Sequence, residues 1–272
     1  MDSIKKQSIL YCIVLFKCDL EHSKTYSSLL NDDYRSWLYI YDNSPEPHNI
    51  TRPNTIYVHD KNNSGLSVAY NSASLYAKGH GFEWVLLLDQ DTDFTNIRIE
   101  DYLNAISQNP NIYLFAPKVR VGSGLYMSPC VLKHKSGHLM SCVPSGIIDL
   151  EKYSIINSGM CVNVKAMIYC GGYNEKVFLD YSDIEFLDRF KKNYPTAYII
   201  NKEIIQNLSA LSDDKATTIN RYRLFCRSVK HCHSSVWTDK LWFLIVVARR
   251  GLSICLRNAT IEPLKIFFKE YL

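Results

Sequence analysis

The chain has 272 residues, of which 47% are hydrophobic, so it can bury a full globular core. Its nine cysteines form no Cys-x-x-Cys pair, which argues against a zinc site or a disulfide framework and fits a reducing cytosol. Residues 215–272 hold eleven Lys and Arg against three acids, a charge of +8, and the overall +4 therefore leaves −4 for the first 214 residues. A basic tail on an acidic body favours an anionic partner for the tail, either membrane headgroups or nucleic acid.

The N-terminal half alternates apolar runs with helical patterns. Two lysines precede the first apolar run, but no small-residue cleavage site follows it, so we interpret the run as a buried strand and not a signal peptide. The predicted strands are 9–16, 37–41, 55–58, 84–88 and 112–116, and the predicted helices are 21–34, 66–78 and 97–108. This alternation predicts an α/β fold with a mostly parallel central sheet flanked by helices.

The second half is less regular. Residues 119–144 are rich in Gly, Ser, Pro and His, which indicates a long loop or a β-hairpin. Beyond it we predict a strand that ends in a turn over 155–159, helices over 165–170 and 183–192, and a final strand over 196–205.

The C-terminal tail is basic and aromatic over 220–231. Its later part, 237–256, contains the apolar run LWFLIVVA, which is far shorter than the roughly 20 residues needed to span a bilayer. Two interpretations stay open: a core helix packed on the α/β body, and an interfacial helix lying in the headgroups. The adjacent Arg249 and Arg250 favour the membrane surface.

Three acids, Asp89, Asp91 and Asp93, follow the apolar strand 84–88. In open α/β sheets, ligands bind just outside the carboxyl ends of the strands, so these acids lie where a site is expected. Carboxylate oxygens at this spacing suit Mg²⁺ or Mn²⁺, which bind one or two acids together with substrate phosphates. The alternative is that the acids cap the next helix or stay solvated.

Four stretches in order, YDNSP, NNSGLSVAYN, LLLDQDTD and SGMCVNVKAMIYCGGYNEKVFLDYSDIEFLDR, resemble the family 2 inverting glycosyltransferases, especially the bacterial branch described as rhamnosyltransferases. The resemblance covers roughly residues 9–227. It implies a GT-A fold, with a Rossmann-like nucleotide-binding half and an acceptor half in a domain of residues 1–214, followed by a helical extension over 215–272.

The resemblance also implies donor-binding roles. Asp42 would accept the imide N–H of a uracil or thymine ring, and Asp89 would lie by the ribose or a metal-bound water. Asp91 would bind the metal. The nucleotide and diphosphate cleft would be lined by Asn63, Gly65 and Asn71, where a glycine permits close backbone approach.

A second set of roles concerns the acceptor. Asp183 matches the general base that takes the proton of the acceptor hydroxyl, although a helix N-cap is the alternative role for an Asp at that position. The sugar and acceptor region would include Ser158, Gly159, Glu185 and Arg189. For Ser158 and Gly159, a plain turn at the end of a strand is the alternative.

The chain departs from the family at one point. Family members often place a metal-binding His after the last strand, whereas this chain has Gln206 or Asn207 there. An amide oxygen binds a hard cation less strongly than a carboxylate does, so the metal dependence is open.

Two other functions compete with sugar transfer. A haloacid-dehalogenase-like phosphatase also uses Asp-x-Asp, but it expects Thr where this chain has Asp93, and usually on the first strand. A non-enzymatic nucleic-acid-binding module would use the basic tail. We expect instead a cytoplasmic enzyme, peripheral on the inner face of the cell membrane, that takes a dTDP- or UDP-sugar and a lipid-linked glycan acceptor and does not bind nucleic acid.

Overall fold

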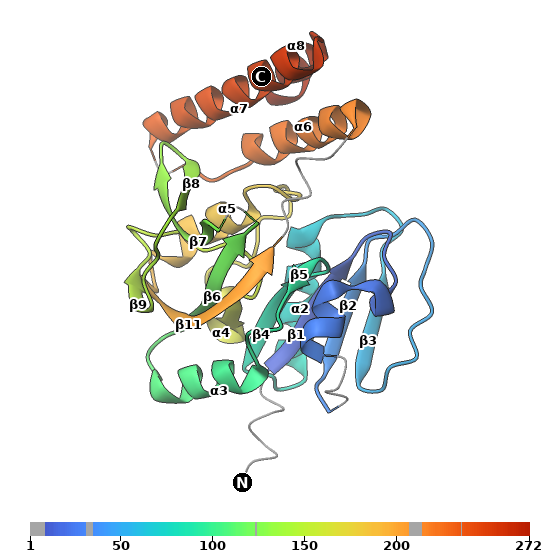
Figure 1. Cartoon of the computed structure of the whole chain (residues 1–272), viewed down its shortest axis with the longest axis vertical. Coiled ribbons are helices and arrows are strands. Elements are labelled where there is room, and N and C mark those ends of the chain that lie inside the picture. The colour runs from blue at the N-terminus through green and yellow to red at the C-terminus, as the bar shows by residue number, and fades with distance from the viewer. Residues whose placement is uncertain (1–8, 31–34, 123, 207–213, 235) are drawn as a thin grey trace.

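The computed structural model describes residues 9–30, 35–122, 124–206, 214–234 and 236–272, and within them eleven strands form one central sheet (Figure 1). The strands are β1 (Ile9–Leu15), β2 (Leu38–Asp42), β3 (Thr55–His59), β4 (Trp84–Asp89), β5 (Thr92–Asp93), β6 (Leu114–Val121), β7 (Tyr126–Lys133), β8 (Ser136–Met140), β9 (Gly146–Asp149), β10 (Cys161–Asn163) and β11 (Thr196–Gln206). The α-helices are α2 (Leu66–Gly79), α3 (Ile99–Gln108), α4 (Val164–Tyr169), α5 (Ser182–Phe190), α6 (Lys215–Lys230), α7 (Trp237–Asn258) and α8 (Glu262–Ile266). Short 3-10 or π-helical segments are η1 (Leu20–His22), η2 (Tyr26–Leu30) and η4 (Phe267–Tyr271).

The sheet has a parallel half and a mixed half. Strands β3, β2, β1 and β4 are parallel, as the sequence predicts, whereas β10 runs antiparallel between β4 and β6. Strand β11 is parallel to β6, and both β5 and β9 pair with it in the antiparallel sense. Because β1 pairs Leu15 with Asp42 on one side and Val14 with Asp89 on the other, the ends of β2 and β4 flank the end of β1.

Strand β4 is buried on both faces. Val85 and Leu87 belong to the apolar cluster under α2, α4 and α5, while Leu86 and Leu88 belong to the cluster on the opposite face under α3 and η2. Both clusters exclude water from the strand, which explains why its sequence is continuously apolar and does not alternate. The prediction of a doubly buried strand is confirmed.

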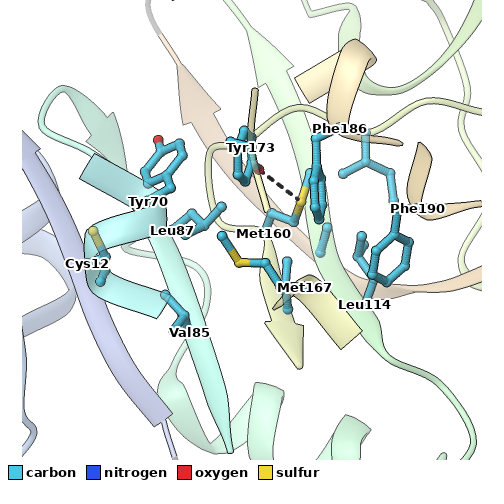
Figure 2. Packing of buried hydrophobic residues seen from close by; sticks show 14 of the residues in the cluster. Cys12, Tyr70, Val85, Leu87, Leu114, Met160, Met167, Tyr173, Phe186 and Phe190 are labelled. Atoms are coloured by element: carbon cyan, nitrogen blue, oxygen red, sulfur yellow. Dashed lines mark hydrogen bonds between the residues drawn. The ribbon is translucent and has the colours of Figure 1, made fainter. Parts of the chain in front are cut away.

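Aromatic contacts join the two halves of the sheet across the first cluster (Figure 2). Tyr173 stacks on Phe186 of α5 with ring centroids 4.4 Å apart, and its ring lies 5.2 Å from that of Tyr70 on α2. The Tyr173 hydroxyl also donates to the sulfur of Met160 at 3.9 Å. Tyr173 therefore links α5 to α2, although more than a hundred residues separate the two helices.

Two predicted elements are wrong. Over 21–34 the described part, 21–30, is not one α-helix but contains η1 and η2, because the Ser23 and Thr25 hydroxyls donate to the carbonyls of Gln90 and Thr92 and draw the chain onto the end of β4. Over 155–159 there is no strand; the chain turns, and the strand forms at β10 instead.

The sequence predicted either a long loop or a β-hairpin over 119–144, and the structure has a β-hairpin there. Strands β7 and β8 pair across a turn in which His134 and Lys135 have positive φ angles. In Figure 1 this hairpin reaches from the sheet toward α7. Strand β9 was not predicted.

The C-terminal helices have an apolar cluster of their own. Tyr222 and Phe225 of α6 pack with Phe243, Val247 and Ile254 of α7. In the part of the chain that the structure describes, no helix combines the length and the apolarity needed to cross a membrane.

A contact between α6 and α7 generates the first prediction. A Cβ atom at Gly251 would lie 2.4 Å from the hydroxyl oxygen of Tyr222, which donates to the Val247 carbonyl at 3.0 Å. We expect Gly251→Ala to lower the free energy of unfolding by roughly 1–3 kcal/mol in chemical denaturation, because the added methyl overpacks this contact. Gly79→Ala is the matched control, since nothing lies within 4 Å of its added Cβ and alanine favours the helix. Equal stability of the two variants would contradict this packing.

Candidate active site

A cleft of about 300 Å³ opens at the carboxyl ends of β1 and β4. Its lining includes Asn43, Asn63, Gly65, Asp89, Asp91, Phe178, Gln206 and Arg221. These residues come from the ends of β2, β4 and β11, the turn before α2, the loop before α5, and α6. The position agrees with the rule that ligands bind outside the carboxyl ends of parallel strands.

Asp89 is the most constrained carboxylate of the cleft. It accepts hydrogen bonds from the hydroxyl of Ser158, from the Tyr70 hydroxyl at 3.3 Å and from the Gln206 amide at 3.3 Å. Burial raises its pKa, and these donors oppose the shift. The side chain is therefore fixed in one orientation at the end of β4.

The two following acids diverge. Asp91 is exposed in the cleft, and Arg221 of α6 interacts with it electrostatically. Asp93 points elsewhere, because its carboxylate accepts from the amide and hydroxyl of Thr95 and pairs with Lys24 at 3.2 Å. One acid of the three thus has a plain turn-capping role, and the other two share the cleft.

Gly65 is required by a close approach of two chain segments. It has φ +93°, and an added Cβ would lie 2.5 Å from the carbonyl oxygen of Phe178, which accepts from the Leu66 amide. Asn63 precedes it with a φ of +51° and also lines the cleft. The turn is held by Asp60, which accepts from the Ser64 amide at 2.8 Å.

Asp42 lies beside the cleft but is 0% exposed. Its carboxylate accepts from the Tyr57 hydroxyl at 2.6 Å, from the His48 ring at 2.7 Å and from the Ser44 amide at 2.9 Å. Although burial raises its pKa, these hydrogen bonds hold the pKa below its ordinary value. Both oxygens accept hydrogen bonds and the side chain has no exposed surface, so Asp42 orders the loop after β2.

Its neighbour Asn43 faces the cleft. Within the described residues, no donor reaches its buried side-chain oxygen, Oδ1. Such an orphaned acceptor is costly unless a ligand or water satisfies it. Asn43 was missed by the sequence analysis, although the period of two along β2 places it on the opposite side from Asp42.

Three predicted site residues do not line the cleft and instead hydrogen-bond neighbouring segments together: Asn71, Glu185 and Arg189. Asn71 donates to the Tyr173 carbonyl at 2.9 Å and accepts from the Tyr173 amide at 2.7 Å. Glu185 is 3% exposed and accepts two hydrogen bonds from Arg189, at 2.9 and 2.7 Å. Arg189 also donates to the carbonyls of Cys170 and Gly172. These contacts fix α2 and α5 to the turn over 170–173.

Ser158 and Gly159 form a tight turn beneath Asp89. Ser158 is buried and binds Asp89 rather than solvent. Gly159 has φ +76°, its amide donates to the Leu87 carbonyl at 2.9 Å, and its carbonyl accepts from Tyr102 at 2.9 Å. The turn alternative thus describes the local structure, and it also orients a cleft carboxylate.

Asp183 lies in the first turn of α5 and is partly buried. Burial raises its pKa to about 7, repulsion from Asp180 and Asp89 adds to the shift, and the Ile184 amide, at 2.7 Å, opposes it. Its side chain accepts no N-cap hydrogen bond of the usual kind, since the N-cap position is Tyr181. A carboxylate that titrates near neutral pH suits proton transfer.

The cleft carboxylates fit a divalent cation that takes its remaining oxygen ligands from a bound phosphate compound. Among the described residues, no three His, Cys, Asp or Glu side chains converge as a complete metal site. The accessible Asp91 carboxylate, next to Asp89, matches the one or two carboxylates that Mg²⁺ uses beside substrate phosphates. Gln206 donates its amide to Asp89, and Asn207 lies outside the described residues.

Arg221 is the second cleft residue that the sequence analysis missed. It belongs to α6, within a stretch that the charge pattern assigned to an anionic partner outside the body. Its place in the cleft depends on how α6 docks, which no local pattern reveals.

The raised pKa of Asp183 makes a prediction for stability. Between about pH 4, where the unfolded carboxyl titrates, and pH 7, the native state binds the extra proton, so stability falls as pH rises. Asp183→Asn should therefore exceed the wild type in unfolding free energy by on the order of 2 kcal/mol at pH 8, and the gain should vanish by pH 4. Asp93→Asn should lose stability at pH 8, because Thr95 and Lys24 hold the Asp93 pKa low against its burial. Urea denaturation at both pH values measures this, and a destabilised Asp183→Asn at pH 8 would contradict it.

Comparison with known proteins supports a sugar-transfer chemistry. Residues 40–138, which run from β2 into β8, match the family model described as Glycosyl transferase family 2. That stretch contains Asn43, Asn63, Gly65, Asp89 and Asp91. No curated protein matches the chain by sequence.

A solved structure with a TM-score above 0.5 supports the fold assignment. A structure of GalNAc-T7 with UDP, GalNAc and Mn²⁺ is similar over 89% of this chain, with a TM-score of 0.54 and 10% identity. The chain spans about half of that protein, 54% of its length. A structure of residues 1–349 of TarS from S. aureus is similar over 90% of this chain and 72% of that chain, with a TM-score of 0.49 and 13% identity. The mixed sheet with its flanking helices is the GT-A fold, and the match over 40–138 supports a glycosyltransferase.

Proposed function

We propose that the chain transfers a sugar, with inversion, from a dTDP- or UDP-sugar to a hydroxyl of a bacterial surface glycan. The observation that carries the proposal is the composition of one cleft of about 300 Å³, which is lined by two carboxylates, a guanidinium and Asn43. The buried Oδ1 of Asn43 has no hydrogen-bond donor among the described residues. Rhamnose is our first choice of sugar, on the resemblance alone. The match to the family model favours this function over a phosphatase or a nucleic-acid-binding module.

The pyrimidine ring is assigned to the end of β2. Uracil and thymine carry an imide N–H, and a buried oxygen without a donor is the group that such an N–H satisfies. Asn43 offers that oxygen, whereas the Asp42 carboxylate is occupied by Tyr57 and His48. We therefore move the base contact from Asp42 to Asn43, with Asp42 as a positioning residue.

The diphosphate is assigned to the middle of the cleft. Asn63 and Gly65 bring a backbone turn to one wall, and Arg221 brings a positive charge to another. Asp91, with Asp89 beside it, would hold Mg²⁺ or Mn²⁺. A bound divalent ion would stabilise the negative charge that develops on the leaving nucleoside diphosphate.

Asp183 is assigned as the general base. It would accept the proton of the acceptor hydroxyl as that oxygen forms a bond to the anomeric carbon, while the bond from that carbon to the phosphate oxygen breaks and the nucleoside diphosphate leaves. The pKa of about 7 keeps the carboxyl ionised above neutral pH and basic enough to hold the proton. Glu185 and Arg189 support this role by fixing α5 to its neighbours. Ser158 orients Asp89 by donating a hydrogen bond to its carboxylate.

The acceptor in this proposal is lipid-linked, and the enzyme works at the cytoplasmic face of a membrane. Nine free cysteines suit a reducing compartment. The basic charge of residues 215–272 favours an anionic surface.

Donor binding can be tested without knowing the acceptor. In thermal-shift measurements with Mn²⁺, dTDP and UDP compounds should raise the melting temperature, because a ligand of the native state stabilises by mass action, and purine nucleotides should not. Asp91→Ala should remove the part of the shift that depends on Mn²⁺. Asp93→Ala, an acid of the same loop that pairs with Lys24, should keep it. A flat nucleotide panel for the wild type would overturn the proposed function.

The base contact makes a separate prediction. Asn43→Ala should weaken UDP or dTDP binding by roughly 10- to 100-fold in calorimetry, because a hydrogen bond to a buried acceptor is lost. Asn104→Ala, on the exposed side of α3, serves as the control. Unchanged affinity of Asn43→Ala, together with a loss in Asp42→Ala at unchanged stability, would return the contact to Asp42.

The general base is tested by kinetics. Asp183→Asn should lower kcat by about 10²- to 10⁴-fold while the donor Kd changes little. In the wild type, kcat/KM should fall tenfold per pH unit below about pH 7, where the carboxyl is protonated, and level off above it. Asp188→Asn, whose carboxylate pairs with Lys135 at 2.8 Å, should keep that pH profile. Wild-type turnover in Asp183→Asn would show that another group is the base.

A further inference from the structure

Helix α7 is apolar on two opposite faces. One face packs on α6 through Phe243, Val247 and Ile254, which are almost fully buried. The opposite face carries an outward stripe of five large apolar side chains. This outward stripe consists of Trp237, Leu241, Ile245, Leu252 and Leu256.

The stripe follows the helical repeat. At 100° per residue, its five members fall within about 100° of one another and lie opposite the packed face. Trp237 is 75% exposed and Leu256 is 85% exposed. A helix on the surface of a globular protein normally presents charged and polar groups there, so this face is built for a partner.

Cations flank the outward stripe. Lys240, Arg249 and Arg257 are exposed on the same helix. The acid of α7 is turned inward, because Asp239 pairs with Lys135 of the β7–β8 turn at 3.1 Å. No acid among the described residues pairs with these three cations, so the outward side of α7 combines an apolar stripe with positive charge.

The acids of α8 and η4, which follow α7, are also paired with cations. Glu270 of η4 pairs with Arg227 of α6 at 2.8 Å, and Glu262 of α8 pairs with Arg223 at 3.9 Å. Lys265 remains exposed on α8. The positive character thus continues past the end of α7.

We infer that the outward stripe of α7 lies in the headgroup region of an anionic membrane. The 22-residue helix is roughly 33 Å long, and a rod of that length with a narrow apolar stripe and basic flanks matches an interfacial helix lying parallel to the surface. Trp237 has an amphipathic ring of the kind that settles at the headgroup level. In Figure 1, α7 and α8 form the outermost layer of the molecule, beyond α6.

A second copy of the chain fits the same face less well. Two outward stripes in contact would bring Arg249 and Lys240 of both copies together, and like charges at an interface cost binding free energy. Anionic headgroups supply the opposite charge along the whole helix. Each Lys or Arg near such a surface contributes about 1 kcal/mol.

The inference deepens the membrane location given under the proposed function, and it is tested with the full chain and sedimenting vesicles. No sugar transfer is measured, so failure to bind vesicles is distinguishable from failure to bind a nucleotide or to transfer a sugar. Vesicles of phosphatidylcholine with phosphatidylglycerol should carry the wild-type protein down, and added salt should release it. Leu241→Gln with Ile245→Gln should lower the partition coefficient more than tenfold. Lys240→Gln with Arg249→Gln should lower it by roughly 30-fold, the equivalent of two charges.

Two controls make the result specific to the outward stripe. Leu75→Gln replaces an exposed leucine on α2 and should bind vesicles like the wild type. Circular dichroism melts should show that every variant stays folded. Wild-type protein that stays in the supernatant, or variants of the stripe that sediment normally, would overturn the inference. A wild-type dimer in sedimentation velocity that the Leu241 and Ile245 substitutions dissociate, without vesicle binding, would assign the face to a second copy.

Discussion

The Asp89 carboxylate, held at the end of β4, is the constraint on which the rest of the site depends. Its donors come from three different places: Tyr70 from α2, Ser158 from the turn before β10, and Gln206 from the end of β11. A half-buried carboxylate without such donors would be destabilising, so each donor must be in place. One side chain thus ties the parallel half of the sheet to the mixed half and closes the floor of the cleft.

The partial burial of Asp89 also affects the pKa of Asp183. A negative charge kept in a partly dry site acts over a longer range than it would in water, and repulsion from Asp89 is one of the causes that raise the pKa of Asp183. The Asp89 carboxylate in the cleft and the Asp183 carboxylate at the start of α5 are therefore electrostatically linked. Arg221 lines the same cleft as Asp89, where it offsets the negative charge of Asp91.

The outline of the fold could be predicted because its signals are local: β4 is a run of apolar residues closed by acids, and α5 repeats its apolar side chains every three or four residues. The prediction of a helix over 21–34 was wrong because side-chain hydroxyls such as that of Thr25 bind backbone carbonyls far along the chain, here that of Thr92. Helix propensity does not include such contacts. Of the candidate site, Asp89 and Asp91 line the cleft and their predicted roles stay predictions, whereas Asp42 and Glu185 are buried against internal partners. The Glu185 pairing with a residue four positions later was readable from helical spacing; the docking of α6 was not.

Two adjacent residues of α6 have different environments. Arg221 lines the cleft, and Tyr222 donates to the Val247 carbonyl of α7. The smallest fragment with a complete cleft therefore extends beyond residue 214. Because α6 carries one wall, local unfolding of the C-terminal helices would open the cleft while the sheet stays intact. A ligand bound in the cleft would oppose that opening, so occupancy of the cleft and order in the C-terminal helices are thermodynamically coupled.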